Sequence, residues 1–120
     1  MNFVDLIEEA KMDGCSDVHI TVGTSIARRR YGKLEMLEPI PTAQESTNLI
    51  LETLTEDQIR RIRSGEDLDF AYMIPSGTRV RANIYHQRNN LAATYRILQS
   101  KIPTFDELEI PEAVRKLVNE

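Results

Sequence analysis

The residues in this chain best suited to chemistry are arginines that recur within one short stretch. Residues 79–98 read RVRANIYHQRNNLAATYRIL and contain Arg79, Arg81, Arg88 and Arg96. Guanidinium groups gathered on one surface favour phosphate or carboxylate, because each keeps its charge and presents a planar fork of donors. Whether these side chains act together depends on the elements that position them.

Apolar and polar side chains alternate through most of residues 68–98, which predicts half-buried strands joined as hairpins. A two-residue turn at Asn89 and Asn90 would pair Asn83 with Arg96 across the second hairpin. This register gives the hairpin one apolar face and one polar face. The polar face would carry Arg79, Arg81, Asn83, Thr94 and Arg96.

The rest of the chain predicts an α/β (α+β) domain with a mostly antiparallel sheet and helices packed on one face. Residues 3–10 have helical apolar spacing and residues 17–22 alternate as a strand. Gly32 is predicted to lie at the turn of a first hairpin. Two capping boxes, Thr42 with Glu45 and Thr55 with Gln58, predict two short helices.

Composition limits the classes of function that remain. A length of 120 residues fits one domain, and a net charge of -4 provides no general attraction to nucleic acid. The lone Cys15 excludes an internal disulfide. The N-terminus lacks the pattern of a signal peptide, and no apolar run approaches the roughly 20 residues of a membrane span. We therefore expect a cytoplasmic protein without direct membrane insertion.

The motifs of common catalytic sites do not occur in this sequence. His19, His86 and Cys15 do not have the spacing of metal ligands, so no metal is expected. Asp17 and His19 share a strand face and more plausibly form a polar network than a hydrolase site. Neither a P-loop nor GxGxxG is found. The chain alone is therefore predicted to be no enzyme and to hold no cofactor beyond contacts from the arginines.

Two other interpretations of the arginines follow from spacing. Asp67 and Asp69 have the parity to form cross-strand ion pairs with Arg81, and spacing alone favours this interpretation. Tyr85 among the arginines could instead indicate a nucleic-acid surface. That interpretation is disfavoured, because Tyr95 falls on the apolar face and the net charge is negative.

Two stretches resemble the type IV pilus retraction ATPases, the PilT group of the type II/IV secretion ATPase superfamily. GCSDVHITVGTSIARRRYGKLEML is similar to the family's ASDLHL…G…R…G.L opening. RVRANIYHQRNNLAATYRILQSKIPTFDEL is similar to its RFRVNxFxQ…FR.IPSxxPTxEEL segment, and DLDFAY resembles the ETDFSF stretch before it. The matching positions are Arg79, Arg81, Asn83, Gln87, Tyr95, Arg96, Pro103 and Leu108.

The resemblance implies that this chain is the N-terminal domain of such an ATPase. Residues 1–110 would form a PAS-like domain, and 111–120 would begin a linker or helix toward a RecA-like motor domain. The full-length protein would be a homohexamer that binds ATP and Mg near the junction of these domains. Arg81 and Arg96, with Arg79 a weaker candidate, would reach the terminal phosphates of ATP. This implication outweighs the ion-pair interpretation.

The same resemblance implies where the protein works and which alternatives remain. Motor domains of the same and neighbouring subunits would be its partners, along with pilus machinery that holds it at the cytoplasmic face of the inner membrane. An N-terminal domain of a type II secretion or pilus-assembly ATPase is one alternative, and a stand-alone PAS-like sensor is another. Arg29 matches the family's first hairpin, whereas the roles of Arg28 and Arg30 stay open.

Overall fold

The computed structural model describes residues 2–98, which form a mixed α/β fold as predicted. Every strand pairing in the described sheet is antiparallel. The elements in chain order are α1 (Phe3–Met12), β1 (Cys15–Thr21), β2 (Ala27–Arg30), β3 (Lys33–Met36), α2 (Ala43–Leu51), α3 (Glu56–Arg63), β4 (Leu68–Met73), β5 (Arg79–Gln87) and β6 (Asn90–Leu98).

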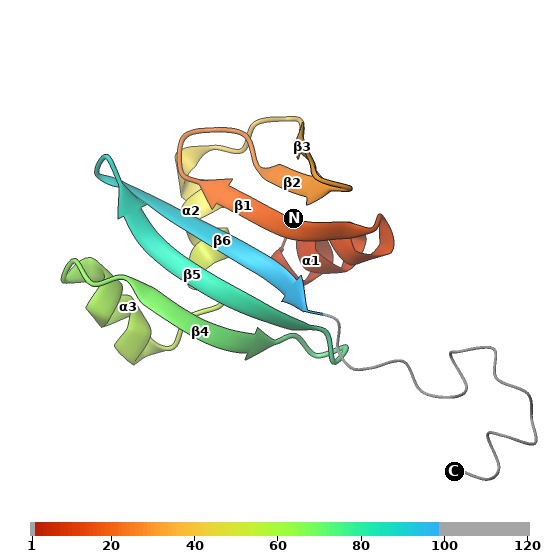
Figure 1. Cartoon of the computed structure of the whole chain (residues 1–120). Coiled ribbons are helices and arrows are strands. Elements are labelled where there is room, and N and C mark those ends of the chain that lie inside the picture. Colours follow the sequence, from red (N-terminus) through yellow and green to blue (C-terminus); the bar gives the residue numbers. More distant parts are fainter. Residues whose placement is uncertain (1, 99–120) are drawn as a thin grey trace, which may run out of the picture.

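The first and last strands of the described chain lie side by side at the centre of the sheet. Its strand order is β3-β2-β1-β6-β5-β4, so β1 is hydrogen-bonded to β6. Figure 1 shows α1 and α2 behind the sheet and α3 beside the β4 edge. The opposite face of β1, β5 and β6 is not covered by a described helix. The helices α1 and α2 therefore pack on one face, as expected, and α3 lies at the β4 edge.

The helix starts follow the capping signals in the sequence. The Asn2 side chain accepts a hydrogen bond from the Asp5 backbone N–H at 2.8 Å at the start of α1. Both predicted capping boxes are present, at Thr42 for α2 and at Thr55 for α3. These contacts satisfy N–H groups that have no partner inside the helix, so local sequence is enough to set these boundaries.

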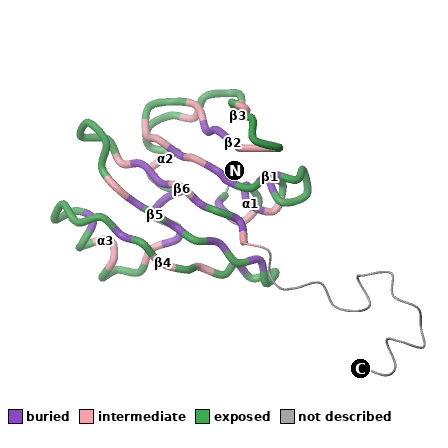
Figure 2. The backbone as a smooth tube through the Cα atoms, viewed as in Figure 1, coloured by how far each residue is buried: buried purple, intermediate pink, exposed green. Residues whose placement is uncertain are grey.

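The core lies between α1, α2 and the apolar face of the sheet. Buried and exposed residues alternate along β5 and along β6 from Ala93 onward (Figure 2), as expected when only one face is covered. Phe3 packs edge-on against Tyr95, with ring centroids 4.6 Å apart, and against Tyr72 at 5.8 Å. Aromatic rings thus join the first helix to the centre of the sheet.

The turn between β5 and β6 differs from the predicted one. It is formed by Arg88 and Asn89, whose φ angles are 52° and 69°, and Gln87 is paired with Asn90. The prediction of an Asn89–Asn90 turn was wrong, because the two positive φ angles of such a tight hairpin are taken one residue earlier. Asn90 instead begins β6.

Because the turn lies one residue earlier than predicted, each residue of β5 pairs with a β6 residue two positions away from its predicted partner. Asn83 is paired with Thr94 instead of Arg96, and Arg81 is paired with Arg96. Side chains alternate with a period of two, so a two-residue change in pairing keeps each residue on its predicted face. The shared polar face was therefore correct although the partners were not.

Arg28 connects the first hairpin to the end of α1. Its register partner on β1 is the buried Val18, which places it on the helix side of the sheet. Arg28 donates to Asp13 at 3.0 Å and to Glu35 at 3.3 Å, and its side chain is only 12% exposed. This contact gives Arg28 a structural role, which sequence alone did not reveal.

Replacing Arg28 with alanine should lower the free energy of unfolding by about 1–2 kcal/mol, because two carboxylates lose a charged, largely buried partner. Arg60→Ala is the matched control, since Arg60 pairs with Asp57 while 70% exposed. Exposed pairs of this kind contribute about 0–1 kcal/mol. Urea denaturation of both variants measures the difference. Equal losses would show that Arg28 does not anchor the hairpin.

Candidate functional site: the arginine face

The side of the sheet that no described helix covers carries the predicted arginines. Strands β5 and β6 supply most of this surface, and β1 supplies the residues beside β6. We call it the arginine face. It comprises Arg79, Arg81, Asn83, Thr94 and Arg96, together with Asp17 and His19.

Two of the arginines stand directly opposite each other. Arg81 on β5 is the register partner of Arg96 on β6. Arg96 is in turn the register partner of Asp17 on β1. Arg79 is paired with Leu98 near the end of the hairpin, two residues along β5 from Arg81. The structure therefore brings Arg81 and Arg96 together, with Arg79 on the same face but farther along the strand.

Arg81 forms an exposed ion pair with Asp69 on β4. Its Nε donates to Asp69 Oδ1 at 2.8 Å and its Nη2 to Oδ2 at 3.5 Å. The hydrogen bond from Arg81 lowers the pKa of Asp69. Both side chains are well over half exposed, so water and salt weaken this attraction. Asp67, the other acid considered, lies 3.9 Å from His86 Nδ1.

Arg96 faces a different kind of carboxylate. Its Nε lies 3.6 Å from Asp17 Oδ2, which is an ion pair slightly too long for a direct hydrogen bond. The Asp17 side chain is 9% exposed, whereas that of Arg96 is 68% exposed. The guanidinium thus remains open to solvent while its partner is nearly buried. Such an arginine is held on one side and free to bind an anion on the other.

Asp17 was not identified from sequence as a partner of Arg96. Sequence placed it correctly on one face with His19, whose Nδ1 lies 3.3 Å from Thr94 Oγ1. One signal in the sequence could have revealed the irregular strand next to Asp17. Cys15 and Val18 are both apolar, and both are buried. Strict alternation cannot put residues three apart on the same face, so an irregularity had to fall between them.

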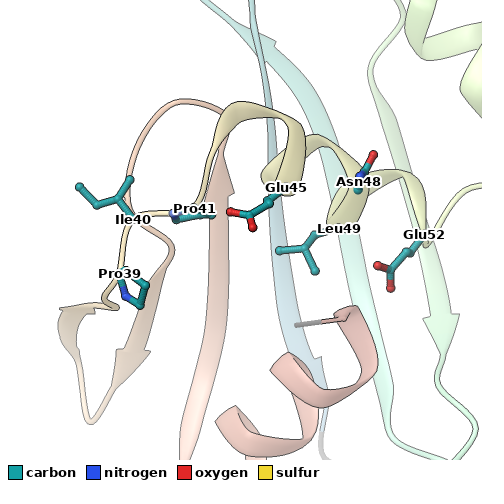
Figure 3. A pocket seen from close by; sticks show the side chains of 7 residues that line it. All are labelled: Pro39, Ile40, Pro41, Glu45, Asn48, Leu49 and Glu52. Atoms are coloured by element: carbon teal, nitrogen blue, oxygen red, sulfur yellow. The ribbon is translucent and has the colours of Figure 1, made fainter.

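Two surface hollows lie outside the paired arginines. The larger, about 340 Å³, runs between residues 39–41 and α2 (Figure 3), and none of its lining residues belongs to the arginine face. The smaller, about 240 Å³, lies under the β2–β3 hairpin and includes His19 and Arg29. Arg29 donates to the Gly32 carbonyl at 3.2 Å, which ties it to its own hairpin.

Other kinds of site find little support in the described part of the chain. Between residues 2 and 98, no group of three His, Cys, Asp or Glu side chains is arranged to hold a metal ion. Cys15 is buried, and burial raises its pKa, with Arg28 opposing the shift. No helix in this part of the chain has the length and apolarity needed to cross a membrane.

Comparison with curated proteins connects this fold to pilus ATPases. The chain is 29% identical over 118 residues to the type IV pilus ATPase PilU of Pseudomonas aeruginosa, covering 98% of this chain and 31% of PilU. It is 24% identical to the pilus retraction ATPase PilT of the same organism, covering 34% of that protein. No protein-family model matches the chain.

Solved structures agree with these relatives. A crystal structure of the pilus retraction motor PilT with bound ADP superposes with a TM-score of 0.76 at 30% identity, covering 98% of this chain and 35% of that one. The Legionella pneumophila ATPase DotB shares the fold, with a TM-score of 0.70 at 21% identity. The chain spans about a third of the length of these proteins. In sequence and in fold, it corresponds to the N-terminal domain of the PilT-like secretion ATPase family.

Proposed function

We propose that this domain supplies arginines to ATP at its interface with a motor domain, in a hexameric ATPase that retracts type IV pili. Arg81 and Arg96 are the principal residues and Arg79 a secondary one. The observation that carries the proposal is the direct opposition of Arg81 and Arg96 on a sheet face that no helix among residues 2–98 covers. A sheet fixes the spacing of two such groups far better than a loop does.

The chemistry of this arrangement suits a phosphate chain. Two facing guanidiniums repel each other, and an anion bound between them attracts both and offsets that repulsion. In phosphoryl transfer, charge develops on the transferred group, and a positioned arginine stabilises it. The exposed Arg81–Asp69 pair does not oppose this role, because a phosphate of higher charge competes well with an exposed carboxylate.

ATP and Mg would be bound mainly by the motor domain of the full-length protein. None of the 120 residues forms a P-loop, so the phosphate-binding loop has to come from elsewhere. Residues 1–110 would be the PAS-like unit, and 111–120 would lead toward the motor. The expected boundary at residue 110 lies outside the described residues. The curated relatives are ATPases by name, and the PilT motor of similar fold was crystallised with ADP.

The proposal includes the assembly and its setting. Each domain would contact the motor domains of its own and a neighbouring subunit of a homohexamer, held at the cytoplasmic face of the inner membrane by pilus machinery. A secretion or pilus-assembly ATPase is the second candidate, supported by the shared fold of DotB. A core-binding sensor is disfavoured, because Phe3, Tyr72 and Tyr95 fill the space between α1 and the sheet.

The test is to purify the full-length protein and to measure phosphate release from ATP together with its mass in solution. A hexamer with Mg-dependent ATPase activity would support the proposal. Loss of twitching motility on deletion of the gene, with secretion intact, would favour retraction over the second candidate. A full-length protein without ATPase activity would refute the proposal.

A further inference from the structure

Asp17 is the first residue of β1 after a β-bulge, and its pairing with Arg96 on β6 places it on the arginine face. Cys15 is paired with Arg30 and Asp17 with Arg29, so two steps along β1 match a single step along β2. Ser16 is the extra residue. In a regular strand, residues two apart point to the same face, but the bulge turns Cys15 into the core cluster while Asp17 lies on the opposite face. Bulges often serve to redirect one side chain in this way.

The burial of Asp17 has an energetic cost that needs compensation. Asp17 as a whole residue is 6% exposed, and it is the only charged residue buried among those described. A buried carboxylate is tolerated when a cation is close, and its register neighbours on the two sides are Arg29 and Arg96. Arg29 donates to the Gly32 carbonyl instead. The cation that pairs with Asp17 is Arg96, whose Nε lies 3.6 Å from Asp17 Oδ2.

The two facing arginines are thus held from outside by two carboxylates of different character. Asp69 pairs with Arg81 while 57% exposed, and Asp17 pairs with Arg96 while 9% exposed. Like charges placed directly opposite on neighbouring strands repel, and this repulsion favours conformers in which the guanidiniums separate. A buried carboxylate moves little and is poorly screened, so it restrains its arginine more firmly than an exposed one does.

We propose that Asp17 is a positioning residue for Arg96, which rests on the proposed function of Arg96 toward ATP. Asp17 holds the Nε edge of the guanidinium, and the remaining N–H donors of Arg96 are left for a phosphate oxygen. Asp17 itself does not touch the nucleotide. It acts by limiting the positions that Arg96 can take, and misplacement of a reacting group by about 1 Å can cost roughly 10²-fold in rate.

The experiment is a double-mutant cycle on the ATPase activity of the full-length protein. Asp17→Asn keeps the size of the side chain and removes its charge. We expect it to lower kcat about 10-fold or more with KM for ATP nearly unchanged, because orientation rather than binding is lost. In the Arg96→Ala background, Asp17→Asn should have almost no further effect. Asp57→Asn, an exposed acid of α3, is the matched control and should leave kcat unchanged.

The results separate this inference from the proposed function. If Arg96→Ala lowers kcat but Asp17→Asn leaves it at the wild-type value, the inference alone is overturned. An equal loss from Asp17→Asn in both backgrounds would show a structural role and would also overturn it. If Arg96→Ala itself leaves kcat unchanged, both fail. Should Asp17→Asn not assemble, Asp17→Glu gives the second test, because it retains the charge on a longer side chain. We expect Asp17→Glu to keep a higher kcat than Arg96→Ala, and a kcat as low as that of Arg96→Ala would overturn the inference.

Discussion

Replacing Arg96 with alanine in the full-length protein should lower kcat for ATP hydrolysis by about 10²-fold or more while hexamers remain intact. The reason is that a guanidinium aimed at the transferred phosphoryl group acts mainly in the transition state, where the charge it stabilises develops. Arg96 is 68% exposed, so its removal leaves no cavity in the core, although the nearly buried Asp17 loses its ionic partner. Steady-state kinetics together with the mass of the assembly measure both parts of this prediction.

Arg81→Ala should produce a comparable loss, because Arg81 is the register partner of Arg96. Arg79→Ala should have a smaller effect, since Arg79 lies farther along β5. Arg60→Ala, on the exposed surface of α3, controls for the general loss of a positive charge. Unchanged turnover in both the Arg81 and Arg96 variants would rule out the proposed role of this face.

Truncating Tyr95 to alanine should destabilise the domain by about 3–5 kcal/mol, the usual cost of removing a large buried aromatic side chain. Tyr95 is fully buried and packs edge-on against Phe3, so the change empties the contact between α1 and the centre of the sheet. Domains are stable by only about 5–15 kcal/mol, and this loss is therefore a large share. Urea or thermal denaturation gives the measurement.

Tyr95→Phe is the matched control, since it keeps the ring and removes the hydroxyl. The hydroxyl has no hydrogen-bond partner among the described residues, although the Thr53 side chain is near enough to influence its pKa. We expect stability equal to or above that of the wild type, because an unsatisfied buried hydroxyl is costly. A loss as large as that of Tyr95→Ala would mean that the ring packing is not what Tyr95 contributes.

The pH dependence of this pair provides a second comparison. Burial raises the pKa of Tyr95 well above its ordinary value, with Thr53 opposing the shift in part. The stabilisation linked to the neutral phenol is therefore complete below about pH 10, where unfolded tyrosine begins to ionise, and decreases above it. Tyr95→Phe should lose less stability than the wild type on going from neutral to strongly alkaline pH.

Much of the fold follows from local patterns in the amino-acid sequence. Alternation through β5 and β6 was enough to assign each arginine to a face, even with the turn misplaced, because side-chain direction depends only on whether a residue is odd or even along the strand. The capping boxes at Thr42 and Thr55 similarly set two helix starts, since their hydrogen bonds span three residues.

The contacts that give the arginines their different surroundings were decided only by the tertiary structure. The turn at Arg88 and Asn89 paired Arg81 with Arg96, and the register of β1 against β6 placed Asp17 beside Arg96. Arg28 on β2 similarly reached Asp13 at the end of α1. These partners come from strands and helices distant in sequence, and their meeting depends on register and burial across the whole sheet. Local propensities carry no information about either.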